Sequence, residues 1–456
     1  MTDRFARTDG SSTAACNVGN YDYCGGSWKG IENNLDYISG MGFDAIWISP
    51  VTKNVAQGYH GYWQSDLYAL NENFGTEQDL LDLSDALHAR AMYLMVDVVT
   101  NHFGSETAAP DVDYSVYSPF NDEKYFHPYC EMDYDNQTSA ELCWMYDNLP
   151  DVRTEDASIV QTYSAWITEL ISKYNIDGLR VDSAKHVDKA SLTAFCDAAD
   201  VYCLLEVANG DPEYAYPYQD VVGDGGITNY PLYYAFTETF LTDGTNRTIE
   251  DFAYNIYQNA NATDASLQGT FTENHDNPRI AWYNADIAIA KTALAFTILT
   301  DGIPIVWQGQ EQHLDGADDP GCREAVWLSS SGGMSTDSEL YQYTTMLNKI
   351  RRHAIKKTAG WWTKRTTRVL NYSEDTVALR KGALRIVLTT AGSGQAAGTW
   401  VVRDTGFTEG EKVVDLVACG AFTAGSDGDV EVDTGAGAVV VLITTAFAAG
   451  SGLCDL

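Results

Sequence analysis

Seven short apolar segments recur between residues 43 and 308 and constrain the fold of this chain more than any other feature. The expected strands cover residues 43–50, 93–99, 178–182, 201–207, 226–230, 269–271 and 302–308. Helical patterns separate several of them, at residues 31–41, 76–90, 154–174, 188–199 and 285–299. Strands that alternate with helices form parallel sheets. The pattern predicts a parallel (β/α) barrel, one strand short of eight, whose site lies at the C-terminal ends of the strands.

Two other parts of the chain lack this alternation. Residues 103–153 are irregular and rich in Asp, Tyr and Pro. From residue 361 onward, short apolar or alternating runs are separated by Gly, Ser and Asp, which predicts an antiparallel β-sandwich. We therefore expect a barrel domain over residues 1–100 and 154–360, an inserted domain over 101–153 and a C-terminal domain over 361–456.

The charge of the chain excludes some classes of partner. The net charge is −36, and nucleic acids and anionic membranes bind basic surfaces. No run of 18 apolar residues is present, so we expect no membrane span. A neutral substrate and a secreted protein fit this composition, although the polar N-terminus does not have the pattern of a signal peptide.

The cysteines favour an oxidising compartment. Three pairs bracket two short loops and the end of the chain, and we expect them as disulfides: Cys16 with Cys24, Cys130 with Cys143, and Cys419 with Cys454. None has CxxC spacing, which argues against zinc. Cys196 and Cys203 lie in apolar surroundings and are expected as buried thiols. The alternative is a cytosolic enzyme with nine free thiols. Four sequons, at Asn136, Asn246, Asn261 and Asn371, agree with secretion.

The stretch Gly178–His186 is an apolar strand that ends in a group of charged residues. Arg180 precedes Asp182 by two positions, so both side chains lie on the same face of the strand. A guanidinium beside an aspartate keeps its pKa low and the group ionised, which suits a nucleophile. The alternative is a structural ion pair at the end of a strand.

Two further carboxylates follow expected strands in the same way, Glu206 and Asp276. Hydrolysis of a glycosidic bond needs one carboxylic acid to protonate the leaving oxygen and a second carboxylate to attack or to activate water. Glu206 follows the apolar run 203–205, so burial should raise its pKa and fit it as the acid. Asp276 could stabilise positive charge on the sugar. Each carboxylate alone could be a capping or salt-bridging group, but the three together predict glycoside hydrolysis.

With these motifs in view, the chain resembles the fungal α-amylases of the Taka-amylase type, in glycoside hydrolase family 13. The motifs that carry the resemblance are Asp97–His102, Leu149–Asp151, Gly178–His186, Leu205–Val207 and Phe271–Arg279. The similarity runs over nearly the whole chain, from Thr2 to Cys454. The resemblance implies a (β/α)8 TIM barrel, an inserted domain and a C-terminal β-sandwich.

The resemblance also implies a role for individual residues. Asp182 matches the nucleophile, Glu206 the acid/base and Asp276 the stabiliser of the transition state. The implied substrate-binding residues are His60, Tyr62, Trp63, His102, Arg180, Lys185, His186, His275, Asp319 and Arg323. Among them, His102 and His275 would hydrogen-bond the sugar next to the scissile bond, and Tyr62 would stack on it. The alternatives are histidines satisfied within the core and aromatic rings that only pack there.

A calcium ion is implied as well. Asn101, Glu141, Asp151 and the backbone carbonyl of His186 match the family's calcium ligands, and all four are the hard oxygen donors that calcium prefers. Such an ion would tie residues 101–153 to the barrel and brace the loop that carries Lys185. The alternative is a set of solvated acidic loop residues.

Several positions depart from the family pattern. Leu205 replaces the usual Gly before the acid, and Asn209 replaces an Asp. Tyr216 occupies a position that is Cys in close relatives, so one family disulfide is missing, and Cys322 is unusual beside Arg323. We expect these changes to affect the shape of the subsites and the stability more than the reaction.

The expected function is retaining endo-hydrolysis of α-1,4 bonds in starch and maltooligosaccharides by a secreted, monomeric enzyme. The alternatives are an α-glucanotransferase or α-glucosidase with the same site, and a non-catalytic glucan-binding homologue. The resemblance also places the segment matching Thr2–Phe5 at the end of the first barrel strand. Because the sequence starts at Met1, we expect most of that strand, and a signal peptide, to be missing from it.

Overall fold

The computed structural model describes residues 1–241, 247–330, 332–396 and 398–456. The sequon at Asn246 therefore lies outside the described residues. The chain divides into two compact units. Unit 1 comprises residues 1–208, 217–228 and 323–334, and unit 2 comprises residues 209–216, 229–322 and 335–456.

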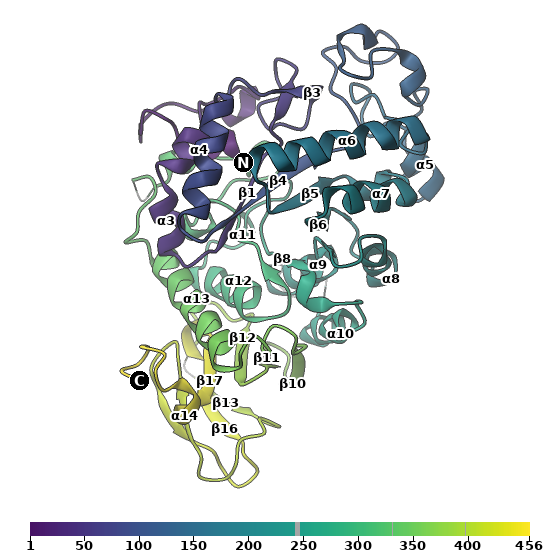
Figure 1. Ribbon diagram of the computed structural model, residues 1–456. Coiled ribbons are helices and arrows are strands. Elements are labelled where there is room, and N and C mark those ends of the chain that lie inside the picture. The colour runs from purple at the N-terminus through teal and green to yellow at the C-terminus, as the bar shows by residue number, and fades with distance from the viewer. Residues whose placement is uncertain (242–246, 331, 397) are drawn as a thin grey trace. The chain divides into compact units, whose positions relative to one another are not determined.

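Unit 1 is built on a five-stranded parallel sheet in the order β1-β4-β5-β6-β7 (Figure 1). Its strands are β1 (Ala45–Ile48), β4 (Tyr93–Val99), β5 (Gly178–Asp182), β6 (Tyr202–Leu205) and β7 (Gly226–Ile227). In the register of this sheet Val99 pairs with Asp182, and Val181 with Leu205. The C-terminal ends of β4, β5 and β6 therefore lie side by side, and the residues that follow them are brought together.

The sequence explains why the helices that connect these strands form. The main ones are α4 (Glu77–His88), α6 (Ala157–Tyr174) and α7 (Lys189–Ala199). A capping box between Thr76 and Asp79 starts α4. Helices α6 and α7 pack against each other (Figure 1), and α6 buries one side of an amphipathic pattern that includes Ile159 and Trp166.

The rest of unit 1 is made of short elements. They are α1 (Thr2–Phe5), α2 (Trp28–Glu32), α3 (Leu35–Gly40), the antiparallel pair β2 (Thr52–Asn54) and β3 (Gln64–Leu70), and α5 (Gln137–Leu142). Residues 101–153 are mostly irregular, as expected, and the disulfide between Cys130 and Cys143 closes the loop around α5. The first residues differ from the expectation, because Thr2–Phe5 forms a helical turn and not the end of a strand.

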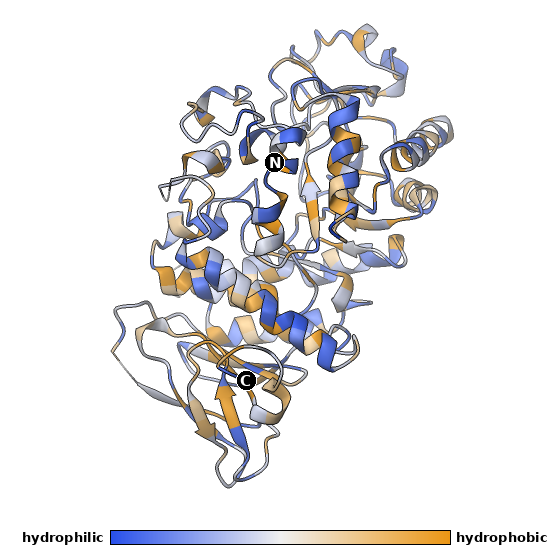
Figure 2. Ribbon diagram, turned by 60° about the vertical axis from the view of Figure 1, so that its left-hand side comes forward, coloured by the Kyte–Doolittle hydropathy of each residue, from blue (hydrophilic) through white to orange (hydrophobic). Residues whose placement is uncertain are grey.

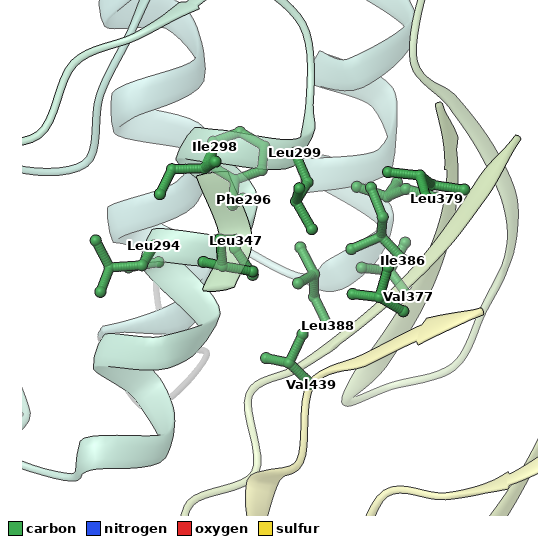
Figure 3. Close-up of a cluster of buried hydrophobic side chains, with 14 of the residues drawn as sticks. Leu294, Phe296, Ile298, Leu299, Leu347, Val377, Leu379, Ile386, Leu388 and Val439 are labelled. Carbon is green, nitrogen blue, oxygen red and sulfur yellow. The ribbon is translucent and has the colours of Figure 1, made fainter. Parts of the chain in front are cut away.

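Unit 2 contains the two remaining parallel strands, β8 (Gly269–Thr270) and β9 (Ile303–Pro304). Its helices are α8 (Pro212–Ala215), α9 (Tyr230–Phe240), α10 (Ile249–Asn259), α11 (Ile280–Tyr283), α12 (Ile287–Leu299), α13 (Glu339–Lys357) and α14 (Thr445–Ala448). Helix α12 is buried along almost its whole length and packs against α13. Its side chains meet those of the C-terminal strands in one hydrophobic core, with Phe296, Leu347 and Leu388 at its centre (Figure 3).

The C-terminal part of unit 2 is antiparallel. A six-stranded sheet has the order β10-β11-β12-β17-β14-β15, and β13 pairs with β16. The strands are β10 (Arg368–Tyr372), β11 (Thr376–Lys381), β12 (Leu384–Thr389), β13 (Thr399–Val402), β14 (Lys412–Asp415), β15 (Ala421–Thr423), β16 (Val430–Asp433) and β17 (Val440–Thr444). The strand drawn next to the C-terminus in Figure 2 has the hydrophobic colour, which agrees with the apolar residues of these strands. The prediction of an antiparallel β domain from residue 361 onward is confirmed.

All seven predicted strands are present, although β7 and β9 are shorter than predicted, and Tyr230, the last residue of the predicted strand 226–230, begins helix α9. The three predicted disulfides are formed, and Cys196, Cys203 and Cys322 are buried thiols. Within the part of the chain that the structure describes, no helix is both long and apolar enough to cross a membrane.

Candidate active site

Strand β5 delivers the central carboxylate of the candidate site. All five of its residues are buried, and Asp182 ends the strand. The next residue, Ser183, has φ 51°, in the left-handed region that a non-glycine residue adopts only when its surroundings fix it. The chain therefore turns sharply just after Asp182.

The guanidinium of Arg180 binds three carboxylates. Its Nη1 lies 2.7 Å from Asp182 Oδ1 and 3.1 Å from Asp97 Oδ1, and its Nη2 lies 2.7 Å from Glu206 Oε1. The anionic neighbours raise the pKa of Arg180 well above its usual value, against the effect of burial. Arg180 is only 1% exposed and positions these carboxylates, while its predicted contact with substrate stays a prediction.

Ser183 joins the same two carboxylates from the other side. Its backbone N–H donates to Glu206 Oε2 at 2.8 Å, and its hydroxyl donates to Asp182 Oδ2 at 2.8 Å. Asp182 and Glu206 thus share two partners, Arg180 and Ser183, and each carboxylate presents one oxygen to each partner. This arrangement fixes both carboxylates against each other.

A second layer holds Arg180. Asp97 accepts hydrogen bonds from the Tyr62 hydroxyl at 2.7 Å and from Trp47 Nε1 at 3.1 Å. Burial raises the pKa of Asp97 to about 7, although the charge of Arg180 acts in the opposite direction. The rings of Trp47 and Tyr62 also face the guanidinium, at 5.2 and 5.7 Å from its carbon.

The predicted aromatic residues lie together beside this network. The ring of His60 stacks on Tyr62 at 5.7 Å and meets Trp63 edge-on at 5.1 Å. Gly104 allows this packing, because a Cβ there would lie 2.4 Å from the Cβ of Trp63. Tyr62 and Trp63 are partly exposed, and His60 is buried. Tyr62 and Trp63 can therefore touch a ligand, while His60 supports them.

His102 is buried and neutral in its surroundings. Its Nε2 donates to the Tyr62 carbonyl at 3.1 Å, and its Nδ1 accepts from the Asn101 amide at 3.4 Å. Burial lowers the pKa of His102, although the charge of Asp182 opposes this shift. The predicted hydrogen bond between His102 and a sugar would, if made by Nε2, compete with the bond to the Tyr62 carbonyl.

Lys185 and His186 follow on the loop after β5. Lys185 Nζ donates to the Ala208 carbonyl at 3.0 Å, and burial lowers its pKa. His186 is buried, its Nδ1 donates to the Ala140 carbonyl at 2.8 Å, and burial lowers its pKa to about 4. Lys185 is partly exposed and can meet a ligand, whereas His186 ties this loop to helix α5.

Two of the residues predicted to bind calcium, Asn101 and Asp151, have side-chain oxygens that would fit such an ion. Asn101 Oδ1 and Asp151 Oδ1 are buried oxygens without a hydrogen-bond partner among the described residues. Their segments are paired, because the backbone N–H of Val152 donates to the Asn101 carbonyl at 2.8 Å. Glu141 follows Ala140 in the chain, and the Ala140 carbonyl accepts a hydrogen bond from His186 Nδ1. Buried acceptors left unpaired cost free energy, and a hard cation would satisfy them. No cluster of three or more His, Cys, Asp or Glu suited to a metal occurs in the described residues, so amide and carbonyl oxygens would have to complete the site.

The remaining predicted residues divide between the units. In unit 2, His275 is buried with its Nε2 3.4 Å from the carboxylate of Asp276, and its ring lies 5.6 Å from that of Trp307. Asp276 and Asp319 are exposed. In unit 1, Arg323 is buried, and its Nη1 donates to the Tyr59 hydroxyl at 3.2 Å.

Three residues of the network were missed by the sequence analysis as site residues, namely Ser183, Asp97 and Trp47. Ser183 directly follows Asp182, but a serine in a loop carries no distinctive signal. Asp97 lies on the largely buried strand β4 and Trp47 lies on β1, and the available signal was a polar or amphipathic side chain within an apolar run.

Comparison with known proteins covers the whole chain. Residues 1–193 and 190–375 match the family described as alpha amylase, catalytic domain, and residues 369–456 match alpha-amylase, domain C. Alpha-amylase 2 of Schwanniomyces occidentalis is 46% identical over 468 residues, which cover 100% of this chain and 91% of that protein. The alpha-amylase of Saccharomycopsis fibuligera is 41% identical over 446 residues, with 95% and 88% covered.

A solved structure has the same fold. The alpha-amylase of Malbranchea cinnamomea superposes with a TM-score of 0.95 at 48% identity, covering 100% of this chain and 97% of that one. With the parallel strands and the antiparallel C-terminal sheet, this similarity confirms the predicted fold class, a (β/α)-barrel catalytic domain followed by a C-terminal β domain.

Proposed function

Since the chain belongs to the alpha-amylase family, and is therefore a glycoside hydrolase that cleaves α-1,4 bonds within starch, we propose that Asp182, Glu206 and Asp276 carry out its reaction. The observation that supports the first two roles is their shared pair of partners, Arg180 and Ser183. Two carboxylates held by one guanidinium must lie close together. A short separation, about 5–5.5 Å, belongs to retaining glycosidases.

In the first step Asp182 attacks the anomeric carbon of the sugar. A bond forms between an Asp182 oxygen and that carbon, and the bond to the leaving oxygen breaks. Glu206 gives its proton to the leaving oxygen, so that the departing glucan carries a hydroxyl. In this proposal, Asp276 stabilises the positive charge that develops on the ring.

In the second step Glu206 acts as a base. It takes a proton from a water molecule, whose oxygen attacks the anomeric carbon, and the bond to Asp182 breaks. The two inversions restore the α configuration of the sugar. Arg180 and Ser183 keep both carboxylates in position throughout, which reduces the cost of bringing the reacting groups together.

The sugar would be held mainly by aromatic and polar side chains. In this proposal Tyr62 stacks on the sugar beside the scissile bond, with Trp63 next to it. Lys185 is proposed to face the leaving-group side. His102 and His275 are proposed as hydrogen-bond partners of the sugar, and Asp319 and Arg323 as contacts further along the glucan.

Calcium is proposed as a structural ion. Asn101, Glu141, Asp151 and the carbonyl of His186 would hold it, and the unpaired buried side-chain oxygens of Asn101 and Asp151 support this assignment. A bound ion would supply charge compensation and brace residues 101–153, without a direct part in bond cleavage.

We also propose the domain limits expected from the sequence, a barrel over 1–100 and 154–360, an insertion over 101–153 and a C-terminal domain over 361–456. Secretion is supported by the three disulfides, which persist in oxidising compartments. The expected state is a monomer that binds starch and maltooligosaccharides, without nucleic acid or membrane partners.

The test is digestion of soluble starch with product analysis. Short maltooligosaccharides that carry the α anomer when first released, as seen by NMR, are the expected result. Longer glucans would indicate transfer, and an unchanged substrate would indicate a binding protein. Initial β anomer would contradict Asp182 as a nucleophile.

The matched pair of variants is Asp182→Asn and Asp197→Asn. Asp182→Asn should lower kcat by at least about 10³-fold, because the nucleophile is removed without a change in shape. Asp197 is exposed on α7, so Asp197→Asn should retain activity. Equal activity of the two variants would contradict the assignment.

A further inference from the structure

Three tyrosines outside the proposed site lie together on the surface of unit 2. Tyr254 and Tyr257 belong to α10, and Tyr372 ends β10. Their exposed fractions are 60%, 54% and 45%. Helix α10 and strand β10 pack against each other (Figure 1). We call these three residues the tyrosine patch.

The sequence of α10 places its two tyrosines on one face. Phe252 and Ile256 are buried on the side of the helix that faces the core, and Tyr254 and Tyr257 are three residues apart on the outer side. Core packing therefore does not explain these two rings, because the helix is already anchored by other side chains.

Glu250 links the helix to the strand. Its charge raises the pKa of Tyr372, with which it also shares a hydrogen bond, and Tyr257 adds to the shift. The side chains of Glu250, Tyr257 and Tyr372 are therefore near one another. Tyr372 extends the aromatic surface of α10 across to β10.

Polar groups border the rings. The Gln258 amide donates to the Tyr254 hydroxyl, and the Asn261 amide donates to Gln258 Oε1 at 2.8 Å. Flat apolar faces surrounded by hydroxyl, amide and carboxylate groups suit a ligand that also has apolar faces and polar edges. A sugar has them, because its C–H faces are apolar and its rim carries hydroxyls.

The charge of the protein narrows the choice of ligand. A net charge of −36, with Glu250 in the patch, disfavours an anionic polymer. The substrate of this family is neutral, and one chain of it is long enough to meet a protein at more than one place. A second contact with the same polymer raises the effective concentration of the substrate at the enzyme.

We propose that the tyrosine patch is a second binding site for α-1,4-glucan chains, made of Tyr254, Tyr257 and Tyr372. The proposal rests on the proposed function for the identity of the glucan. Its role is to hold polymeric starch, and it takes no part in bond cleavage.

The experiment compares adsorption to starch granules in the presence of calcium. The triple variant Y254A/Y257A/Y372A and the double variant Y68A/Y93A are made in the Asp182→Asn background, so that the granules are not digested. Tyr68 and Tyr93 are 57% and 58% exposed in unit 1 and serve as matched controls. N-glycans are removed beforehand, because the sequons at Asn261 and Asn371 adjoin the patch.

The triple variant should adsorb about tenfold more weakly, and the control should adsorb like the parent. In the active background, the triple variant should lose activity on granules but keep kcat/KM on maltopentaose. Replacing the three tyrosines by tryptophan should restore adsorption, because a flat ring is kept. That rescue distinguishes lost stacking from a damaged fold.

Adsorption of the triple variant within twofold of the parent would overturn the proposal. So would an equal loss in Y68A/Y93A, or a failure of the tryptophan variant to adsorb while its melting temperature is unchanged. Failure of the proposed function would be seen separately, as wild-type protein that leaves soluble starch intact.

Discussion

Ser183 is the residue that most directly couples the two proposed reactive carboxylates. Its left-handed backbone conformation aims the N–H at Glu206, and its side chain bonds Asp182. Sequence motifs predicted the carboxylates themselves, because strand ends and charged residues coincide there. They could not predict Ser183, Asp97 or Trp47, since the partners of a carboxylate depend on contacts between segments that are far apart in the chain.

Ser183→Ala should lower kcat by roughly 10- to 100-fold with little change in KM. The variant loses the hydroxyl that bonds the charged Asp182, while the backbone bond to Glu206 remains. Steady-state kinetics on maltopentaose measure the effect. Ser172→Ala, at an exposed position of α6, is the control. An unchanged kcat would mean that Arg180 alone is sufficient to place Asp182.

His313 should lower the free energy of unfolding at mildly acidic pH. Burial lowers its pKa from 6.5, although Asp315, Asp286 and Glu339 oppose the shift, and its Nε2 is buried without a hydrogen-bond partner among the described residues. The unfolded chain therefore binds more protons as the pH falls through 6.5, so the free energy of unfolding decreases there.

His313→Asn tests this effect and suits the left-handed backbone at this position. Denaturant unfolding at pH 7.5 and 5.5 should show a smaller difference in the variant than in the parent. A difference of the same size in both proteins would show that other groups account for the acid sensitivity.

At the scale of elements, prediction succeeded where periodicity was clear. Strands β4, β5 and β6 are apolar runs with marked ends, and α6 has an amphipathic pattern. Helix α9 was not predicted, because most of its residues are buried and no polar face alternates with an apolar one. Helix α10 was also missed, although its capping box of Thr248 and Asp251 was a usable signal.

Strand β9 is shorter than the apolar run that predicted it, and its partner β8 is also only two residues long. The missing family disulfide at Tyr216 also has a structural counterpart. The Tyr216 hydroxyl donates to Asn259 Oδ1 at 3.2 Å, and the Asn259 amide donates to Asp301 Oδ2 at 3.2 Å. A buried polar network thus connects the segment that a disulfide would otherwise hold.

Removal of calcium should loosen residues 101–153. A chelator should lower the melting temperature of the wild type, because an ion that binds only the folded state stabilises it. Asp151→Ala should cost roughly 2–4 kcal/mol and abolish the further effect of the chelator. Differential scanning calorimetry, with and without chelator, measures both.

Asp147→Ala is the control for this experiment, because Asp147 is exposed in the same segment. It should respond to the chelator like the wild type. If Asp151→Ala lost stability but kept the full response to the chelator, Asp151 would be a structural partner of His127 and not a calcium ligand, since His127 Nδ1 donates to it at 2.6 Å.

At the scale of the whole molecule, charge affects stability more than any single ion pair. With 64 acidic and 28 basic residues, the chain repels itself at neutral pH. Surface ion pairs such as Lys173 with Glu77 contribute little by comparison. The alternation of strands and helices predicted the architecture, but the division of the chain into two units followed no feature that the sequence displays.

Added salt should therefore stabilise the protein. At about 0.1 M salt the screening length falls to about 10 Å, which weakens repulsion between exposed carboxylates. At fixed calcium concentration, the melting temperature should rise between about 0.01 M and about 0.2 M sodium chloride. A fall over this range would mean that exposed ion pairs outweigh the repulsion.

The guanidinium of Arg180 has a consequence for the timing of the proton transfers. It contacts Asp97, Asp182 and Glu206, so its positive charge is shared among three acids. When Asp182 becomes an ester of the sugar, one negative charge disappears from this group. Glu206 then gains a larger share of the attraction to Arg180 and loses a repelling neighbour, just after it has given up its proton. Formation of the covalent bond to the sugar would thereby hold Glu206 in its carboxylate form, which is the form that can act as the base toward water.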